Sequence, residues 1–329
     1  MKVKNILTTT FSVGVALLLT GCGQSVAENN VQTHKNAEVS IQNCSVDQKY
    51  KVSPERIVAL GPGQADLIGK LGAGNTIVGI AQLNGEKIPG SLTEQGHNPQ
   101  VLSENTPPSR EQLLQANPDL VLSPTTYEFN DQQDYASQEQ LTQAGAANYV
   151  AAAGCLDRRS NAQVTDLFTD IDAYGKILGK EEQAQKLRQK AQKQLDEAAK
   201  HAKGKEAPTV AQLYIEGNSV TAIGAGIEHD IAKSAGAQSV FNPKDPEFKE
   251  FFAAEVSREA ILKKNPQAII FTTTSKEHEE SSRKWLKENL SEIKAVKENR
   301  IIAIPASDML PGTWGNLDAV TVINKALYQ

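Results

Sequence analysis

Short apolar runs alternate with amphipathic helical stretches along most of the chain. In the first half, residues 56–60 and 77–80 predict buried strands on either side of a helix over 64–71. In the second half, residues 209–214 predict a strand and residues 228–234 the helix that follows it, before a short strand at 239–241. Strands that alternate with helices are typical of a parallel sheet covered on both faces. The pattern therefore predicts two α/β lobes.

An internal repeat supports this division. Residues 109–122 (SREQLLQANPDLVL) match residues 257–270 (SREAILKKNPQAII) without a gap, with six of fourteen positions identical. In each copy Ser is expected to cap a short helix, Asn-Pro to end it, and an aliphatic run to start a buried strand. The repeat favours one duplicated unit, while a chance likeness of two helix-to-strand units remains the alternative.

The segment between the halves predicts helices. Leu167, Ile171 and Tyr174 recur at helical spacing, Gly179 permits a break, and a charged stretch begins at Glu181. We expect residues 161–181 to form the helix that bridges the lobes, followed by a helix with a solvated face. One crossing helix predicts a stiff connection and modest closure on a ligand.

The N-terminus has the pattern of a secretory signal. Lys2 and Lys4 precede an uncharged apolar stretch over 6–19 that is too short to span a membrane. The tetrapeptide ending at Cys22 (LTGC) resembles a bacterial lipobox, which implies cleavage after residue 21 and diacylation of Cys22. An ordinary signal peptide with a chance cysteine is the alternative.

The same patterns set the expected domain boundaries. Residues 22–52 are polar and lack apolar periodicity, which predicts a lipidated flexible tether. The first lobe is expected over 53–160, the interlobe helix over 161–181 and the second lobe over 182–329. Each lobe is long enough to bury its own core.

Composition changes this interpretation in two ways. A formal net charge of −5 over 329 residues lacks the basic surface that nucleic acid requires. Beyond Cys22 only Cys44 and Cys155 remain, and an even pair in an exported chain is typical of a disulfide. Two unpaired thiols are the alternative. The predicted bond would attach the tail to the first lobe.

The motifs taken together resemble a known family. Residues 56–74 (RIVALGPGQADLIGKLGAG), the two Asn-Pro segments and residues 298–305 (ENRIIAIP) are similar to the helical-backbone (class III) substrate-binding proteins of ABC importers for ferric siderophores, haem and cobalamin. The likeness covers residues 55–328. It implies two Rossmann-like lobes bridged by a single long helix, with a ligand cleft between the lobes.

The resemblance also implies partners. It predicts an extracytoplasmic lipoprotein, monomeric, that delivers its ligand to an ABC permease dimer with a cytoplasmic ATPase. One acidic residue per lobe is expected to dock on permease arginines, and these positions fall on Asp66, where the family usually has Glu, and on Glu259. The alternative for both is a solvated charge near a helix N-terminus. A Gram-positive cell surface is the preferred location, and the periplasmic side of a membrane the alternative.

Ligands of open α/β lobes bind beyond the carboxyl ends of the strands, which selects the candidate ligand residues. Tyr127 and Trp314 are expected to offer aromatic faces, and Arg158 or Arg159 to contact carboxylate, catecholate or hydroxamate oxygens. Tyr214 lies at a strand end, and Gly224 is expected to turn backbone amides toward the ligand. Surface arginines and half-buried aromatic side chains are the alternative for these positions.

The ligand expected is a ferric siderophore, with no permanently bound cofactor. The five histidines are scattered, which disfavours a metal site for a bare ion, whereas a siderophore arrives already chelated. Haem, with Tyr127 and either His229 or Tyr214 as axial ligands, and cobalamin are the alternatives. The chain has no Gly-x-Ser-x-Gly or His-Glu-x-x-His motif, so we predict a binding protein and not an enzyme. A structural surface lipoprotein without a ligand is the alternative from another class.

Overall fold

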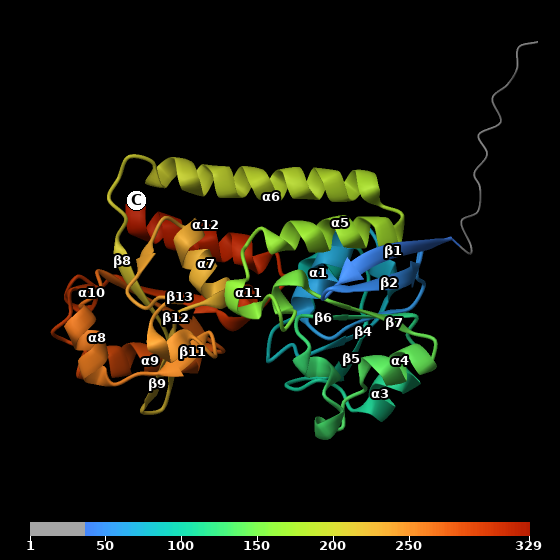
Figure 1. Ribbon diagram of the computed structural model, residues 1–329, viewed down its shortest axis with the longest axis horizontal. Coiled ribbons are helices and arrows are strands. Elements are labelled where there is room, and N and C mark those ends of the chain that lie inside the picture. The colour runs from blue at the N-terminus through green and yellow to red at the C-terminus, as the bar shows by residue number, and fades with distance from the viewer. Residues whose placement is uncertain (1–36) are drawn as a thin grey trace, which may run out of the picture. The chain divides into compact units, whose positions relative to one another are not determined.

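Two large sheets and a two-stranded hairpin organise residues 37–329, which are the residues that the computed structural model describes (Figure 1). The first-lobe sheet is parallel, in the order β5-β4-β3-β6-β7. Its strands are β3 (Ile57–Ala59), β4 (Ile77–Ala81), β5 (Gln100–Ser103), β6 (Leu120–Ser123) and β7 (Ala147–Val150).

The second-lobe sheet is mixed, in the order β11-β9-β8-β12-β13, with β10 beside β8. Strands β8, β10, β12 and β13 are parallel, and β9 and β11 are antiparallel to their neighbours. The strands are β8 (Thr209–Glu216), β9 (Ser219–Ile223), β10 (Gln238–Ser239), β11 (Ala253–Glu255), β12 (Ala268–Thr273) and β13 (Ile301–Pro305). The prediction of two α/β lobes is confirmed.

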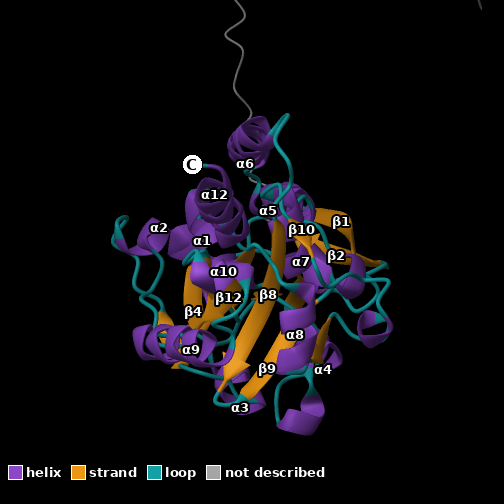
Figure 2. Ribbon diagram, turned by 90° about the vertical axis from the view of Figure 1, so that its left-hand side faces the viewer, coloured by secondary structure: helices purple, strands orange, loops and turns teal. Residues whose placement is uncertain are grey.

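Helices cover both sheets, as Figure 2 shows for the second lobe. They are α1 (Pro62–Lys70), α2 (Gly90–Thr93), α3 (Arg110–Gln115), α4 (Gln138–Gln143), α5 (Asp166–Leu178), α6 (Glu181–Ala202), α7 (Gly226–Ser234), α8 (Arg258–Lys264), α9 (Lys276–Asn289), α10 (Lys294–Lys297), α11 (Ala306–Met309) and α12 (Gly315–Tyr328).

The repeat corresponds to the same local structure in both lobes. The Ser109 hydroxyl accepts the Gln112 amide at the start of α3, and the Ser257 hydroxyl accepts the Ala260 amide at the start of α8. Each helix is followed by an Asn with left-handed backbone, at φ 47° for Asn117 and 43° for Asn265. Asn tolerates this conformation, and the Pro after it prevents the helix from continuing.

The helix that crosses between the lobes is α6 and not residues 161–181, so that prediction is wrong. Helix α5 ends at Gly179, which has φ 63°, and packs on the first lobe. Helix α6 lies along α5 through the Arg188–Asp172 ion pair and then along α12, where Gln194 donates to Asp318 at 2.9 Å. It ends where the chain enters β8 (Figure 1). Because α6 crosses on the outer side of both lobes, only a narrow stripe of its side chains is buried and the rest face solvent. This explains why its sequence is highly charged.

The predicted tether is wrong from Glu38 onward. Strands β1 (Glu38–Asn43) and β2 (Val46–Lys51) form an antiparallel hairpin whose turn, Cys44-Ser45, has positive φ at both residues. Tyr50 is 1% exposed and its hydroxyl donates to the Asn148 carbonyl at 3.0 Å. Burial of alternate hairpin side chains on the first lobe stabilises a segment that looks polar overall.

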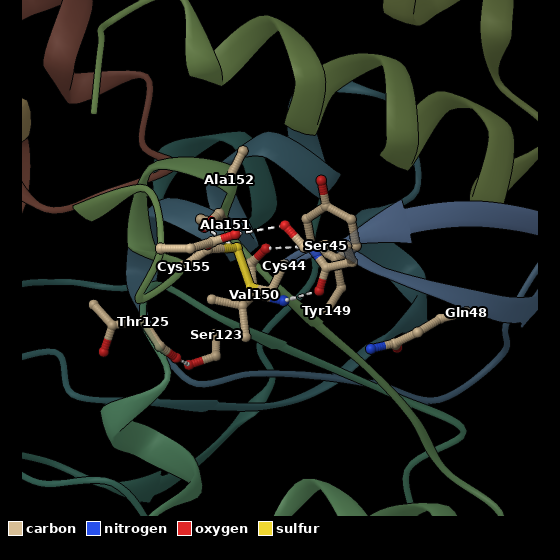
Figure 3. Close-up of a disulfide and its surroundings, with 12 residues drawn as sticks. Cys44, Ser45, Gln48, Ser123, Thr125, Tyr149, Val150, Ala151, Ala152 and Cys155 are labelled. Atoms are coloured by element: carbon tan, nitrogen blue, oxygen red, sulfur yellow. Dashed lines mark hydrogen bonds between the residues drawn. A yellow bond between two sulfur atoms is a disulfide. The ribbon is translucent and has the colours of Figure 1, made fainter. Parts of the chain in front are cut away.

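The disulfide between Cys44 and Cys155 is confirmed (Figure 3). It joins the hairpin turn to the loop that follows β7. The expected signal peptide, residues 1–21, and the lipidation site Cys22 lie outside the described residues. No helix within residues 37–329 is long and apolar enough to cross a membrane.

One hydrophobic core continues from the first lobe into the second beneath α6. It includes Ile57 of β3, Ile171 of α5, Ile231 of α7 and Ile323 of α12, all fully buried. A second cluster fills the other face of the second-lobe sheet, and a third fills the other face of the first-lobe sheet. The lobes are therefore joined by shared packing as well as by chain connections.

Candidate ligand site

The segment after β6 presents an aromatic pair, one ring of which is exposed. Tyr127 is 53% exposed, and its ring lies 5.8 Å from that of Tyr135 in an edge-on arrangement. The placement fits the expectation that Tyr127 offers an aromatic face beyond the carboxyl end of a strand.

Glu128 holds this loop, a role that the sequence did not indicate. One of its carboxylate oxygens accepts from the Ser123 hydroxyl at 2.9 Å, the Thr125 hydroxyl at 2.6 Å and the Thr125 amide at 3.1 Å. The Thr125 hydroxyl in turn accepts the Tyr127 amide at 3.0 Å. Because a buried carboxylate needs such donors, Glu128 fixes the backbone that carries Tyr127. An acidic residue in a polar loop gives no signal of this in the sequence.

The two adjacent arginines have different surroundings. The Arg158 guanidinium donates to both carboxylate oxygens of Asp166, at 3.0 and 2.7 Å, and this hydrogen bonding raises the Arg158 pKa. It donates further to Gln163 at 3.3 Å. Such a bidentate pair occupies the guanidinium fork, so the expected ligand contact does not fit Arg158.

Arg159 keeps its hydrogen-bonding capacity. Within residues 37–329 its side chain makes no hydrogen bond and no ion pair. Its guanidinium lies 4.9 Å from the centre of the Phe251 ring and 5.6 Å from that of Phe252. The two phenylalanines precede β11 in the second lobe, and Phe251 is 42% exposed. A first-lobe cation thus meets second-lobe aromatic rings at the junction of the lobes.

Tyr214 and Gly224 have local roles. The Tyr214 hydroxyl donates to Glu216 at 2.6 Å, and this bond raises the Tyr214 pKa to about 12. The amide of Gly224 donates to the Phe252 carbonyl at 2.9 Å, so it does not face a ligand as expected. A Cβ on Gly224 would lie 2.4 Å from the Phe248 ring. Glycine is therefore required here for packing.

Trp314 is buried, which does not fit the expectation of an open aromatic face. It is 6% exposed, with the ammonium groups of Lys70 and Lys190 at 5.8 and 5.4 Å from its ring centre. The ring borders a cavity of about 190 Å³ between α1 and the segment from α11 to α12. Its role is to pack the first lobe against the C-terminal segment.

The two proposed docking acids differ in exposure. Asp66 accepts from Lys70 at 3.0 Å and lines the cavity beside Trp314, together with Glu86 and Asp308. Burial, then the charges of Asp318, Glu86 and Asp66, raises the Asp308 pKa to about 7. Glu259 is exposed in the first turn of α8, and its repeat partner Glu111 is exposed in the first turn of α3.

The chemistry at the lobe junction is that of a free cation among aromatic surfaces. Within residues 37–329 no group of three or more His, Cys, Asp or Glu residues could hold a metal ion. His229 lines a cavity of about 320 Å³ at this junction, together with Arg158 and Ser160, the chain neighbours of Arg159.

Known proteins share this architecture. The periplasmic binding protein family matches residues 57–307. An uncharacterized ABC transporter substrate-binding lipoprotein of Bacillus subtilis (strain 168), YvrC, is 24% identical over 293 residues, which cover 87% of this chain and 85% of that protein.

Solved structures are similar over most of the chain. A periplasmic binding protein from Veillonella parvula has a TM-score of 0.76 at 20% identity, covering 88% of this chain and 97% of that one. An ABC-type Fe3+-hydroxamate transport system from Saccharomonospora viridis has a TM-score of 0.72 at 21% identity, covering 88% of this chain and 99% of that one. The periplasmic heme binding protein HutB of Vibrio cholerae has a TM-score of 0.64 at 22% identity, covering 83% of this chain and 99% of that one. These likenesses show a shared fold, and the match over residues 57–307 shows that the chain belongs to the periplasmic binding protein family.

Proposed function

We propose that the protein is the extracytoplasmic binding lipoprotein of an ABC importer and captures a ferric siderophore between its lobes. The observation that carries the proposal is the Arg159 guanidinium, which lies beside the adjacent rings of Phe251 and Phe252 and has no hydrogen-bond or ion-pair partner among residues 37–329. The name of the Bacillus relative, an ABC transporter substrate-binding lipoprotein, supports the transport role. The similar Fe3+-hydroxamate system supports an iron ligand.

The side chains favour an anionic aromatic chelate. A guanidinium at a lobe junction attracts negative oxygen atoms through charge-assisted hydrogen bonds. The exposed ring of Tyr127 and the half-exposed ring of Phe251 provide surfaces for stacking. A ferric catecholate complex has both a negative charge and aromatic rings, and its iron needs no ligand from the protein.

Haem is the second candidate, because its propionates would also suit Arg159. Of the expected axial ligands Tyr127 is the most exposed, since the Tyr214 hydroxyl donates to Glu216 and His229 is half-buried in the cavity that Arg158 and Ser160 also line. Cobalamin offers Arg159 a single phosphodiester and has no iron that a Tyr would bind, so the site favours it less than the other two ligands.

A titration panel tests the proposal. The purified protein is titrated with a ferric tris-catecholate, a ferric hydroxamate, haem and cobalamin, with tryptophan fluorescence as the signal. We expect saturable binding of the catecholate with a Kd below about 1 μM. Binding of haem alone, with a tyrosinate axial signature in its spectrum, would transfer the function to haem. Binding of none would leave a structural lipoprotein.

Docking is proposed to use Glu259 and one first-lobe carboxylate. Asp66 is the first-lobe residue that the resemblance implies, but it is ion-paired with Lys70 and only 20% of its side chain is exposed. Glu111 occupies in α3 the position that Glu259 occupies in α8, and it is exposed. The geometry therefore favours Glu111 over Asp66.

Uptake assays on three alanine variants decide between these acids. Glu259→Ala should abolish ligand uptake in cells and leave ligand affinity in solution unchanged, because a desolvated ion pair that loses one partner costs about 2 to 5 kcal/mol. If Glu111→Ala has the same effect and Asp66→Ala has none, Glu111 is the first-lobe contact. Normal uptake by Glu259→Ala would refute the docking proposal.

The lipid anchor on Cys22 completes the proposed function. Two acyl chains would hold the protein stably at the outer face of a membrane, where a permease is reached by lateral diffusion. We expect metabolic labelling with a fatty acid to mark the protein and Cys22→Ala to remove the label. Labelling that persists in Cys22→Ala would exclude this anchor.

A further inference from the structure

The end of β1 and the hairpin turn contact the end of β7 and the loop that follows it at three successive places. The Asn43 side-chain amide donates to the Val150 carbonyl at 2.7 Å and accepts the Val150 amide at 2.9 Å. Cys44 is bonded to Cys155, and the Ser45 hydroxyl donates to the Asp157 carboxylate. Figure 3 shows the disulfide between hairpin and loop. The hairpin thus follows the loop to within two residues of Arg159.

The backbone that carries Arg159 depends on Cys155. The Cys155 carbonyl accepts the amides of Arg158 at 3.0 Å and Arg159 at 2.8 Å. On its other side Gly154 lies so close to Pro124 that a Cβ on it would be 1.9 Å from the Pro124 carbonyl oxygen. Cys155 is therefore held between the loop that carries Tyr127 and the hairpin. The turn that contains Arg158 and Arg159 begins at Cys155.

The Arg159 side chain has no comparable restraint. Its contacts are with the aromatic rings of Phe251 and Phe252, which constrain direction weakly. A long flexible side chain loses conformational entropy when it binds a ligand. A backbone that is already fixed in the bound position reduces this loss, and so increases affinity.

We propose that the Cys44–Cys155 disulfide positions Arg159 for ligand capture, in addition to attaching the hairpin to the lobe. This inference rests on the proposed function. It differs from a purely stabilising role, which would affect unfolding but not the interaction of one side chain with ligand. The distinguishing quantity is the energetic coupling between the disulfide and Arg159.

A double-mutant cycle measures this coupling. The four proteins are the wild type, Cys44→Ser with Cys155→Ser, Arg159→Gln, and all three substitutions together, each titrated with a ferric tris-catecholate well below its unfolding temperature. We expect the serine pair to weaken binding about fivefold to tenfold when Arg159 is present and less than about twofold when it is Gln. An equal loss in both backgrounds would overturn the proposal.

Two further measurements make the outcome independent of ligand and of folding. In the ligand-free serine pair, the amides of Arg158 and Arg159 should exchange hydrogen faster than in the wild type, and unchanged exchange would overturn the proposal. If the serine pair does not fold, Ser45→Ala replaces it in the cycle, because this variant keeps the disulfide and loses only the hydrogen bond to Asp157. It should weaken binding by less than the fivefold to tenfold expected for the serine pair, and only in the background that has Arg159. If the wild type binds no ligand of the panel, the proposed function fails, and the amide exchange still tests separately whether the disulfide orders the backbone of Arg159.

Discussion

Asp170 of α5 stands out among the residues of the first lobe because its carboxyl is fully buried and forms no ion pair within residues 37–329. One oxygen accepts from the Tyr149 hydroxyl at 2.9 Å and the Ala152 amide at 2.8 Å, while the other has no partner within the described residues. Burial raises the Asp170 pKa to about 7. The two hydrogen bonds lower the pKa, but their effect is smaller than that of burial. A neutral carboxylic acid is therefore built into the first lobe below that pH.

This shift makes folding stability depend on pH. Between the unfolded pKa near 3.8 and the folded pKa of about 7, the folded chain holds a proton that the unfolded chain has lost. The free energy of unfolding therefore falls as pH rises through this window, by at most about 1.4 kcal/mol per pH unit, and levels off above it. Asp170→Asn should reduce the difference in stability between pH 4.5 and pH 7.5, measured by denaturant unfolding.

A second carboxyl of α5 provides the control. Asp172→Asn removes a partly exposed carboxyl that pairs with Arg188, and this variant should keep the wild-type pH dependence of stability. Some dependence should remain in Asp170→Asn, because burial also raises the pKa values of Glu228 and Asp308 to about 7. A slope in Asp170→Asn equal to that of the wild type would contradict the assignment.

At the scale of elements, the loop from Val150 to Arg159 depends on close backbone contact. Gly154→Ala would place a methyl group 1.9 Å from the Pro124 carbonyl oxygen, which no side-chain rotation can relieve. We expect a loss of about 3 kcal/mol or more in unfolding free energy, together with weaker ligand binding. Thermal unfolding measures the first effect and titration the second.

The matched control is Gly90→Ala at the start of α2. Its Cβ would meet only the flexible carboxylate of Glu94, at 3.2 Å, so its stability should change by less than about 1 kcal/mol. Equal effects of the two substitutions would show that the loop relaxes freely and that its close packing is not important.

The order of strands and helices in both lobes was predictable from the sequence. Alternating apolar runs and the Ser-capped repeat indicated both lobes, because burial in the core imposes a regular spacing of apolar residues on every strand and helix. The crossing helix was misplaced because α5 is apolar from its packing on the first lobe, whereas α6 crosses on the outside. The hairpin was missed because its alternation spans only Val39, Ile41 and Tyr50 in a polar segment.

The candidate site was predictable only in part. Strand ends indicated Tyr127 and the two arginines, because ligand loops follow parallel strands. Which arginine is free depends on Asp166, and which aromatic ring is open depends on the burial of Trp314, and both are tertiary contacts. Phe251 and Phe252 lie in the connection before a strand, where no periodic signal pointed to them.

At the scale of the whole molecule, the lobes are joined by more than α6. The Gln64 side-chain amide of α1 donates to the carbonyls of Pro311 at 3.0 Å and Gly312 at 3.1 Å, in the segment before α12. Gln64 is 1% exposed, and the shared core continues beneath it. Large hinge motion would break these buried contacts together, so a small closure on ligand is expected.

Solution scattering tests this rigidity. Scattering curves of the wild type recorded with and without a saturating ligand should nearly superimpose. A clear fall in the radius of gyration on ligand addition would contradict the expectation of small closure.

The variant Gln64→Ala removes both hydrogen bonds to the C-terminal segment and should lower the free energy of unfolding by about 1 to 3 kcal/mol.

The proposed capture of an anionic ligand by Arg159 at the lobe junction can be tested with one titration series. The wild type, Arg159→Gln and Arg188→Gln are titrated with a ferric tris-catecholate at low and high salt. Arg188→Gln removes the same charge from α6, where the guanidinium pairs with Asp172 and lies 5.3 Å from the Phe168 ring centre. We predict that Arg159→Gln weakens binding at least about tenfold and reduces its salt dependence, whereas Arg188→Gln binds like the wild type. Unchanged affinity in Arg159→Gln, or an equal loss in both variants, would show that Arg159 does not hold the ligand.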